Sequence, residues 1–268
     1  MNKQFDILII DDEQVILDAV SKICSAEGYR IDSSIYAKDA LSKIKKNVYK
    51  LFICDIMMPD VDGFQFLDEV IKNKIISPVI MTTGYSTVEN AVRSLYNGAI
   101  DFIPKPFTAD ELLNSVSRGL RYLEIQKSLS SYSSQINDAS IIYVPCPAKY
   151  YRLGYSSWAS LEFTGSILIG VTDLYLKTIE SIIEVEFFKI DDEIIQGNPC
   201  IQIKTKDGLI HTVLSPVSGR IIEKNEMLLN DTSIVEKDPY FNGWCYRVIP
   251  SDSDYELKHL IPCSSDRL

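Results

Sequence analysis

The first part of the chain alternates short apolar runs with amphipathic stretches, a pattern typical of α/β folds. Phe5–Ile10 is apolar apart from Asp6, which predicts a strand buried on both faces. Gln14–Glu27 has apolar residues at helical spacing, and Gly28 follows as a helix stop. The same alternation predicts strands at Ile31–Tyr36, Leu51–Cys54, Pro78–Met81 and Ile100–Ile103, and helices at Lys38–Lys46, Asp62–Lys72, Ser86–Asn97 and Thr108–Leu123. This order predicts an α/β, doubly wound, five-stranded parallel sheet.

The pattern changes after a serine-rich stretch. Ser128–Ser140 has six serines in thirteen residues, which predicts a flexible linker or a fraying helix end. From Tyr150 onward, short β-rich runs are separated by turn signals, with one helical stretch at Leu174–Ile183. The runs are Ser166–Val171, Ile182–Phe188, Pro199–Lys204, Leu209–Leu214, Gly219–Lys224 and Trp244–Pro250. We therefore expect a first domain at 1–125, a linker at 126–149 and a mostly β domain, a barrel or sandwich, at 150–268.

The net charge of the chain disfavours one class of function, the binding of nucleic acids. The chain has 27 Lys and Arg residues against 37 Asp and Glu residues, a net charge of −10. Divided after residue 125, the counts are 14 against 18 and 13 against 19, so both halves are acidic. Neither half offers the positive surface that nucleic-acid binding requires, and no nucleic-acid partner is expected. No apolar run is long enough for a signal peptide or a membrane span, so we expect a cytoplasmic protein without membrane contact.

The six cysteines do not form a recognisable metal motif. None belongs to a CxxC pair, and the chain has only two histidines. A zinc site is therefore poorly supported, and reduced thiols packed as small apolar side chains are expected.

Polar residues follow the predicted strands of the first domain at the ends where α/β sheets bind ligands. Asp11 and Asp12 follow the first strand, Asp55 the third, Thr83 the fourth and Lys105 the fifth. Clustered carboxylates repel one another unless a cation neutralises them, and their hard oxygens suit Mg²⁺. An aspartate beside that ion is able to attack phosphorus and form an acyl phosphate, whose charge the ion and Lys105 would stabilise.

These residues belong to motifs in a recognisable order and spacing. The motifs are Asp11-Asp12-Glu13, Asp55-Ile56-Met57-Met58-Pro59-Asp60-Val61-Asp62-Gly63, Met81-Thr82-Thr83-Gly84-Tyr85 and Lys105-Pro106-Phe107. With them, residues 1–125 resemble the receiver domain of two-component response regulators. The resemblance implies that Asp55 accepts a phosphoryl group from a sensor histidine kinase. It implies no other enzyme activity than Mg²⁺-dependent self-phosphorylation and autodephosphorylation.

The resemblance also implies roles for the residues around Asp55. Asp12, Asp55 and the backbone carbonyl of Met57 would bind Mg²⁺ directly, and Asp11 would act through water.

Three further residues take their implied roles from the same resemblance. Thr83 and Lys105 would contact the phosphoryl group, and Thr83 and Phe102 would form the switch, although core packing also explains Phe102. The family has a cis peptide before the proline, here Lys105-Pro106. The expected change of surface would alter contact with the second domain or promote a phosphorylation-dependent homodimer.

The second domain resembles the glycine cleavage system H protein, a lipoyl carrier. The resemblance covers residues 150–262 and rests on Trp158, Gly170-Val171-Thr172-Asp173, Ile183-Glu184-Val185-Glu186, Asp192-Glu193-Ile194-Ile195-Gln196-Gly197-Asn198-Pro199, Ser215-Pro216-Val217-Ser218-Gly219, Asn225-Glu226, Asp238-Pro239-Tyr240, Gly243-Trp244 and Pro250-Ser251-Asp252. The lysine that carries lipoate in that family falls on Gly208, which has no amine, so no lipoate is expected. Lys206 lies nearby but is offset, and Asp207-Gly208 predicts a tight type I′ turn.

The two resemblances predict a phosphorylation-controlled response regulator with an H-protein-like output domain that binds an unidentified protein. Two alternatives remain open at this point. One is a lipoyl-carrier-like component of a metabolic complex, gated by phosphorylation and modified at Lys206. The other is a phosphate sink without an active output.

Overall fold

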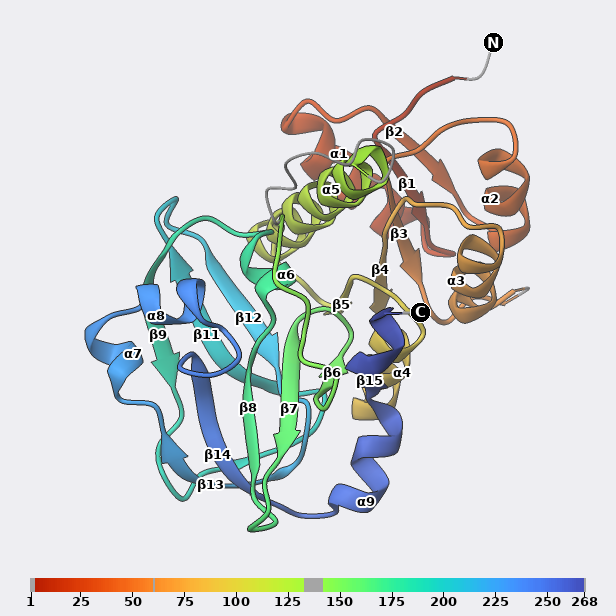
Figure 1. The fold of residues 1–268 in the computed structure, drawn as a ribbon. Coiled ribbons are helices and arrows are strands. Elements are labelled where there is room, and N and C mark those ends of the chain that lie inside the picture. The colour runs from red at the N-terminus through yellow and green to blue at the C-terminus, as the bar shows by residue number, and fades with distance from the viewer. Residues whose placement is uncertain (1–2, 60, 133–141, 268) are drawn as a thin grey trace. The chain divides into compact units, whose positions relative to one another are not determined.

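The computed structural model describes residues 3–59, 61–132 and 142–267, and the chain folds as two compact units, which we describe separately. The first unit contains a five-stranded parallel sheet in the order β2-β1-β3-β4-β5 (Figure 1). Its strands are β1 (Ile7–Ile10), β2 (Ile31–Ser34), β3 (Leu51–Asp55), β4 (Val79–Thr83) and β5 (Asp101–Pro104). The helices that alternate with these strands along the chain are α1 (Gln14–Ala26), α2 (Ala37–Ile44), α3 (Gly63–Lys72), α4 (Val88–Tyr96) and α5 (Ala109–Tyr132). The predicted doubly wound sheet is confirmed, and its strand order reverses between β1 and β3.

The strands of this sheet are buried because helices cover both faces. One core contains alternate strand residues together with apolar residues of α1 and α5, among them Ile7, Ile9, Ile53, Leu17, Val20, Leu112 and Val116. On the opposite face, the rings of Phe52 in β3 and Phe66 in α3 meet edge to face, 5.5 Å apart. Every residue of β1 and β3 is buried, so the ends of these strands hold their polar groups in fixed positions.

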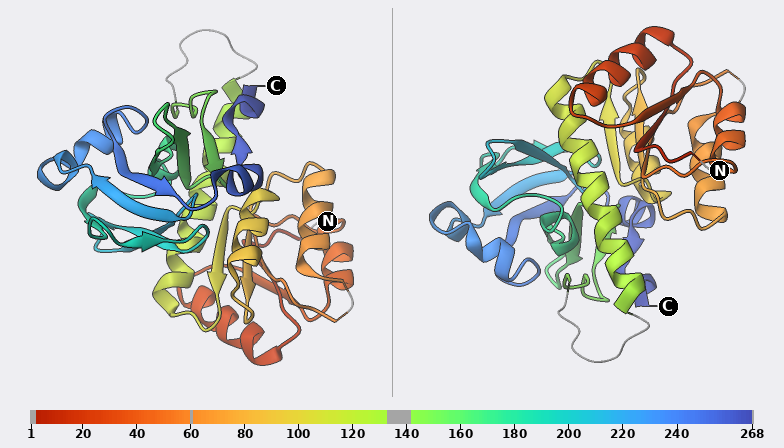
Figure 2. Two further views of the ribbon diagram at one scale, coloured as in Figure 1. Left: turned by 90° about the horizontal axis from the view of Figure 1, so that it is seen from below. Right: turned by 90° about the horizontal axis from the view of Figure 1, so that it is seen from above.

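Helix α5 is longer than the sequence pattern predicts. It begins with a capping box: Thr108 N–H donates to Glu111 Oε2 (2.7 Å), and Glu111 N–H donates to Thr108 Oγ1 (3.2 Å). The helix continues without a break to Tyr132, beyond the predicted end at Leu123 (Figure 2). The first residues of the expected linker are therefore helical, and residues 133–141 lie outside the described residues.

The second unit is built from antiparallel sheets, as the β-rich texture predicts. A seven-stranded sheet has the order β10-β13-β14-β8-β7-β6-β15, and a three-stranded sheet has the order β12-β11-β9. The strands are β6 (Tyr151–Leu153), β7 (Ser157–Leu161), β8 (Ile167–Val171), β9 (Ile182–Phe187), β10 (Glu193–Ile194), β11 (Pro199–Thr205), β12 (Ile210–Leu214), β13 (Gly219–Lys224), β14 (Trp244–Pro250) and β15 (Ile261–Pro262). Short helices α6 (Asp173–Leu176), α7 (Met227–Asn230), α8 (Ser233–Lys237) and α9 (Ser253–Glu256) connect them, with 3-10 turns η1 (Leu257–His259) and η2 (Cys263–Arg267).

Some elements of this unit differ from their predicted extent. The helix expected at Leu174–Ile183 is a single turn, α6, capped by Thr172, whose hydroxyl accepts from Tyr175 N–H (3.2 Å). The pattern also missed β7, whose sequence lacks β-branched residues; its Trp158 is fully buried and donates Nε1–H to the carbonyls of Val171 and Pro239. All six cysteines are free and buried, as predicted. In the described part of the chain, no helix is long and apolar enough to cross a membrane.

Candidate functional site

Lys105 joins two of the predicted acidic residues at the carboxyl ends of the parallel strands. Its ammonium Nζ lies 2.6 Å from Asp11 Oδ2 and 2.8 Å from Asp55 Oδ1. Asp11 directly follows β1, Asp55 ends β3, and Lys105 directly follows β5. The convergence arises because parallel strands end at one edge of their sheet, so residues far apart in sequence meet there. Glu13, the third acidic residue of the first motif, lies 3.9 Å from the same ammonium.

Burial shapes the electrostatics of this site. The side chains of Asp11 and Asp55 are 2% and 4% exposed, and that of Lys105 is 9% exposed. Burial raises the pKa of both Asp11 and Asp55, although hydrogen bonds from Lys105 act in the opposite direction. For Lys105, burial alone lowers the pKa, but hydrogen bonds to Asp11 and Asp55 outweigh it and raise the pKa. The two carboxylates therefore depend on a neighbouring cation to stay ionised together.

The carboxylate oxygens at this site are of the kind that a hard divalent cation prefers. Asp11 and Asp55 present carboxylate oxygens side by side, Asp12 is half-buried next to them, and oxygens are the ligands that Mg²⁺ prefers. Within the described residues, no three Asp, Glu, His or Cys side chains gather as a metal cluster, and Lys105 instead provides the cation between Asp11 and Asp55. The side chain of Met57 is half-exposed. The backbone N–H of Met57 donates to Asp55 Oδ2 (2.7 Å).

The predicted switch residues lie on the neighbouring strands. Thr83 ends β4, is fully buried, and accepts a hydrogen bond from Tyr85 N–H at Oγ1 (3.1 Å). Its carbonyl accepts from Lys105 N–H (2.8 Å), which links the ends of β4 and β5. Phe102 in β5 is 8% exposed, and the Lys105-Pro106 peptide is cis, as the resemblance implies.

A contact that the sequence pattern missed brings α3 close to Asp55. The N–H of Gly63 donates to the carbonyl of Ile56 (2.9 Å), and a Cβ at Gly63 would lie 2.1 Å from the carbonyl oxygen of Asp55. Asp62 caps the helix by accepting from Gln65 N–H (2.8 Å). The Asp-Gly pair in the second motif is the sequence signal for this close approach, because only glycine fits there.

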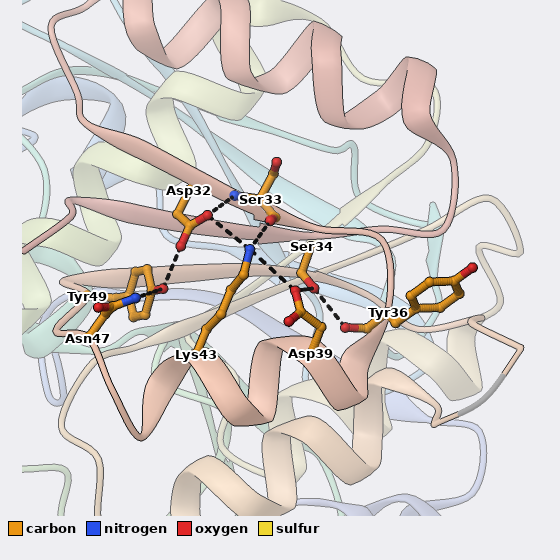
Figure 3. Close-up of polar contacts among 8 residues, drawn as sticks. All are labelled: Asp32, Ser33, Ser34, Tyr36, Asp39, Lys43, Asn47 and Tyr49. Atoms are coloured by element: carbon orange, nitrogen blue, oxygen red, sulfur yellow. Dashed lines mark hydrogen bonds and ion pairs between the residues drawn. The ribbon is translucent and has the colours of Figure 1, made fainter. Parts of the chain in front are cut away.

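A polar network links β2 and α2 (Figure 3). Lys43 Nζ lies 3.0 Å from Asp32 Oδ1 and 3.3 Å from Asp39 Oδ2. The Ser34 hydroxyl contacts Asp39 Oδ2 (2.7 Å), and this hydrogen bond is the main reason that the pKa of Asp39 is lowered. The Ser34 carbonyl accepts from Asp11 N–H (3.2 Å), so the network ends at the acidic site.

Tyr49 completes this network from the loop before β3. Its hydroxyl donates to Asp32 Oδ2 (2.7 Å) and accepts from Asn47 Nδ2–H (3.2 Å). Burial and the hydrogen bond to Asp32 raise the pKa of Tyr49. The sequence periodicity indicates only a weak strand at β2. It does not indicate the network, because Lys43 and Tyr49, which contact Asp32 of this strand, lie far from it in the sequence.

The hairpin between β11 and β12 contains the position of the expected lipoyl lysine. Gly208 has a φ of +84°, and nothing lies within 4 Å of the place where a Cβ would stand. Asp207 Oδ1 accepts from Thr205 Oγ1–H (2.6 Å) and from Leu209 N–H (3.2 Å). The predicted type I′ turn is wrong, because Asp207 does not adopt a positive φ and the loop is instead closed by Thr205 N–H donating to Leu209 C=O (3.0 Å). Side-chain hydrogen bonds of Asp207 stabilise this longer loop.

Comparison with protein families separates the chain into two known domains. The response regulator receiver domain model matches residues 7–117, and the glycine cleavage H-protein model matches residues 149–264. The chain joins a receiver domain to an H-protein domain. The site of Asp11, Asp55 and Lys105 belongs to the receiver domain, and the hairpin with Gly208 belongs to the H-protein domain.

Similar proteins match one domain or the other. The transcriptional regulatory protein ZraR of Klebsiella oxytoca is 32% identical over 126 residues, which are 47% of this chain and 28% of ZraR. A CheY-like receiver domain protein of Methanospirillum hungatei JF-1 is 35% identical with a TM-score of 0.43, covering 47% of this chain and 99% of that one. The glycine cleavage system H protein of Mycobacterium marinum is 20% identical with a TM-score of 0.40, covering 44% and 94%. The chain thus spans less than a third of the length of ZraR.

Proposed function

We propose that this chain is a phosphorylation-controlled response regulator whose Asp55 accepts a phosphoryl group from a sensor histidine kinase. The observation that carries the proposal is the buried Asp55 carboxylate at a strand end, 2.8 Å from the Lys105 ammonium and next to Asp11. Burial gives the carboxylate a fixed position, and the ammonium stands where charge on a phosphoryl group develops. The receiver domain belongs to response regulators, and this supports a kinase as the phosphoryl donor.

The chemistry that we assign to the site is a displacement at phosphorus. A carboxylate oxygen of Asp55 attacks the phosphorus of a phosphohistidine, the P–N bond breaks, and the bonding electrons return to the imidazole, which takes up a proton. Lys105 stays paired with Asp55 and shifts toward a phosphoryl oxygen, leaving Asp11. Mg²⁺ held by Asp12, Asp55 and the Met57 carbonyl, with Asp11 acting through water, would supply positive charge that offsets the phosphoryl oxygens.

The proposed switch begins at Thr83. Its hydroxyl oxygen now accepts from Tyr85 N–H (3.1 Å) and would instead donate its own proton to a phosphoryl oxygen. That movement changes the loop after β4, and Phe102 on the adjacent strand responds to the change. The face of the receiver domain then favours a different contact with the output domain or with a second copy.

Labelling with acetyl phosphate tests the phosphoacceptor. Wild-type protein with Mg²⁺ should gain about one acid-labile phosphate per chain, and Asp55→Asn should gain none. Asp68→Asn is the matched control, because Asp68 is an exposed carboxylate on α3. Equal labelling of wild type and Asp55→Asn would assign the phosphate to another residue. Sedimentation with and without beryllofluoride measures the proposed dimerisation in the same samples.

We further propose that the H-protein domain is an output domain that binds protein and carries no lipoate. Gly208 supplies no amine at the tip of the hairpin, and the acidic composition of the chain disfavours DNA as a partner. Intact-mass measurement after incubation with a lipoyl ligase should therefore give the unmodified mass. A lipoyl adduct, located by peptide mapping on Lys206, would instead support a carrier function. The free cysteines agree with a reducing, cytoplasmic location.

A further inference from the structure

The loop between β4 and α4 follows Thr83, the residue with which the proposed switch begins, and Tyr85 lies at its centre. The N–H of Tyr85 donates to Thr83 Oγ1 (3.1 Å). The carbonyl of Tyr85 accepts from Thr87 N–H (2.9 Å) and from the side-chain amide of Asn90, through Nδ2 (2.9 Å). Both backbone groups of Tyr85 are therefore hydrogen-bonded in this conformation of the loop.

Packing contributes little to the position of this loop. Residues 84–89 are exposed, and the side chain of Tyr85 is 71% exposed. Among the described residues, nothing lies within 4 Å of the place where a Cβ of Gly84 would stand. Thr83, in contrast, is fully buried, and its carbonyl accepts from Lys105 N–H (2.8 Å). The backbone of Thr83 is thus fixed, whereas the chain from Gly84 onward has room to move.

The two donors to the carbonyl of Tyr85 come from different parts of the structure. Thr87 belongs to the loop itself, only two residues further along the chain, so its N–H moves with the loop. Asn90 lies in the first turn of α4, and its backbone N–H donates to Thr87 Oγ1 (3.1 Å), which caps the helix. The side-chain amide of Asn90 therefore ties the carbonyl of Tyr85 to a helix outside the loop.

We propose that Asn90 is a positioning residue, which stabilises the unphosphorylated conformation of the loop between β4 and α4 and so limits the response to phosphorylation. When Thr83 rotates toward the phosphoryl group, its Oγ1 leaves Tyr85 N–H, and Tyr85 moves. That movement also breaks the hydrogen bond from Asn90 to the carbonyl of Tyr85, so this bond opposes the switch. The inference rests on the proposed function and deepens it, because it names a residue that regulates the same site.

The size of the expected effect follows from the exposure of this hydrogen bond. Asn90 is half-buried, so water competes in part for its amide. The net free energy of such a bond is modest, and its loss should shift the equilibrium about three- to fivefold toward the switched conformation. A phosphoryl mimic that binds the switched conformation should then bind more tightly by the same factor, because the coupling between binding and conformation is reciprocal.

Binding of beryllofluoride to the full-length protein tests the proposal. With Mg²⁺ present, Asn90→Ala should bind beryllofluoride about three- to fivefold more tightly than wild type. Asn73→Ala is the matched control and should bind like wild type, because Asn73 is an exposed asparagine directly after α3 whose Nδ2 also donates to a main-chain carbonyl, that of Glu69 (2.7 Å). Equal affinities of wild type and Asn90→Ala overturn the proposal, and so does an equal gain in both variants.

A double-mutant cycle separates this positioning role from a merely structural one. If Asn90 acts through Tyr85 on Thr83, the gain in affinity from Asn90→Ala should vanish in a Thr83→Ala background. The same gain in both backgrounds would show that Asn90 acts independently of Thr83 and would contradict the proposal. Amide hydrogen exchange reports the loop directly: Tyr85 N–H should exchange faster in Asn90→Ala than in wild type, and Lys105 N–H should exchange at the same rate. Unchanged exchange at Tyr85 would mean that Asn90 does not hold the loop.

A failure of the proposed function gives a different result. If Asp55 is not the phosphoacceptor, Asp55→Asn binds beryllofluoride as tightly as wild type does and is still labelled by acetyl phosphate, which overturns this inference as well. If only the role of Asn90 is wrong, labelling and beryllofluoride binding still require Asp55, whereas wild type and Asn90→Ala bind beryllofluoride equally.

Discussion

Asp6 shows how much one buried carboxylate depends on its partners. It precedes β1 and accepts hydrogen bonds from Arg30 N–H (2.8 Å) and Arg30 Nε–H (3.1 Å), while Lys50 Nζ lies 2.8 Å away. Burial alone would raise the pKa of Asp6, but the hydrogen bonds from Arg30 and Lys50 outweigh it and hold the pKa well below its ordinary value. Folding therefore favours the ionised form of Asp6.

The first prediction follows from this low pKa. Asp6→Asn should lower the free energy of unfolding at pH 7 by about 2 kcal/mol, because charge-assisted hydrogen bonds are lost. The unfolded state binds the proton more readily than the native state, so the contribution of Asp6 is complete above the unfolded pKa of about 4 and declines as the pH falls below it. Urea unfolding of both proteins from pH 7 to pH 3 should show converging stabilities. A difference in unfolding free energy between the two proteins that stays constant across this pH range would contradict the low pKa of Asp6.

Gly63 gives a second prediction at the same scale. A Cβ there would stand 2.1 Å from the carbonyl oxygen of Asp55, so Gly63→Ala must displace either α3 or the end of β3. We expect a loss of about 1 to 3 kcal/mol in unfolding free energy and slower labelling of Asp55 by acetyl phosphate. Gly84→Ala is the steric control in the unfolding measurement, because nothing lies within 4 Å of its Cβ position. Equal unfolding free energies for the two variants would refute the steric argument.

At the scale of elements, β2 and α2 are held together by polar contacts where other strands of the sheet use apolar ones. Asp32 receives Tyr49 Oη–H and the Lys43 ammonium, and Ser34 contacts Asp39 (Figure 3). Removal of one member leaves a half-buried polar atom without its partner, which costs free energy beyond the hydrogen bond itself.

Tyr49→Phe should therefore destabilise the receiver domain by about 1 to 2 kcal/mol in denaturant unfolding. Tyr36→Phe is the matched control, because Tyr36 is 50% exposed, whereas Tyr49 is 4% exposed. Both variants lose one hydroxyl and keep the ring. If they unfold at the same denaturant concentration, the hydrogen bond to Asp32 contributes nothing measurable.

The receiver domain was largely predictable because its elements obey simple local patterns. Buried strands such as β1 and β3 are continuous apolar runs, and polar residues directly after them had to meet at one sheet edge. The pairing of Lys105 with both Asp11 and Asp55 was not predictable, because it depends on the distances that the folded sheet imposes. The extent of α5 was missed for a local reason: serines compete for backbone partners, as Ser130 Oγ–H does by donating to Gln126 C=O (2.9 Å), yet the helix continues.

The H-protein domain was less predictable from its pattern. Strand β7 was missed because Ser157–Leu161 carries few strand-forming residues, and its place is fixed by long-range contacts of Trp158. Such features depend on tertiary pairing, which local periodicity does not contain.

At the scale of the whole molecule, the two domains differ in their spectroscopic signals. The receiver core lies around Ile53 and Leu112, and an aromatic cluster around Trp158 belongs to the H-protein domain. The chain has two tryptophans, Trp158 and Trp244, and both stand in the H-protein domain. Tryptophan fluorescence therefore reports the unfolding of that domain, whereas circular dichroism of the helices reports mainly the receiver domain.

This separation gives the last prediction. Mg²⁺ at about a hundred times its dissociation constant should stabilise the receiver domain by about 2.7 kcal/mol through mass action, which raises the midpoint of its helical unfolding by several degrees. The fluorescence midpoint of the H-protein domain should stay in place, since no proposed ligand of the ion lies there. Asp12→Asn and Asp55→Asn should each abolish the shift, whereas Asp68→Asn should keep it. A Mg²⁺-dependent shift that persists in Asp12→Asn and Asp55→Asn would locate the ion elsewhere. An equal shift of both signals in wild type would mean that the two domains unfold as one unit.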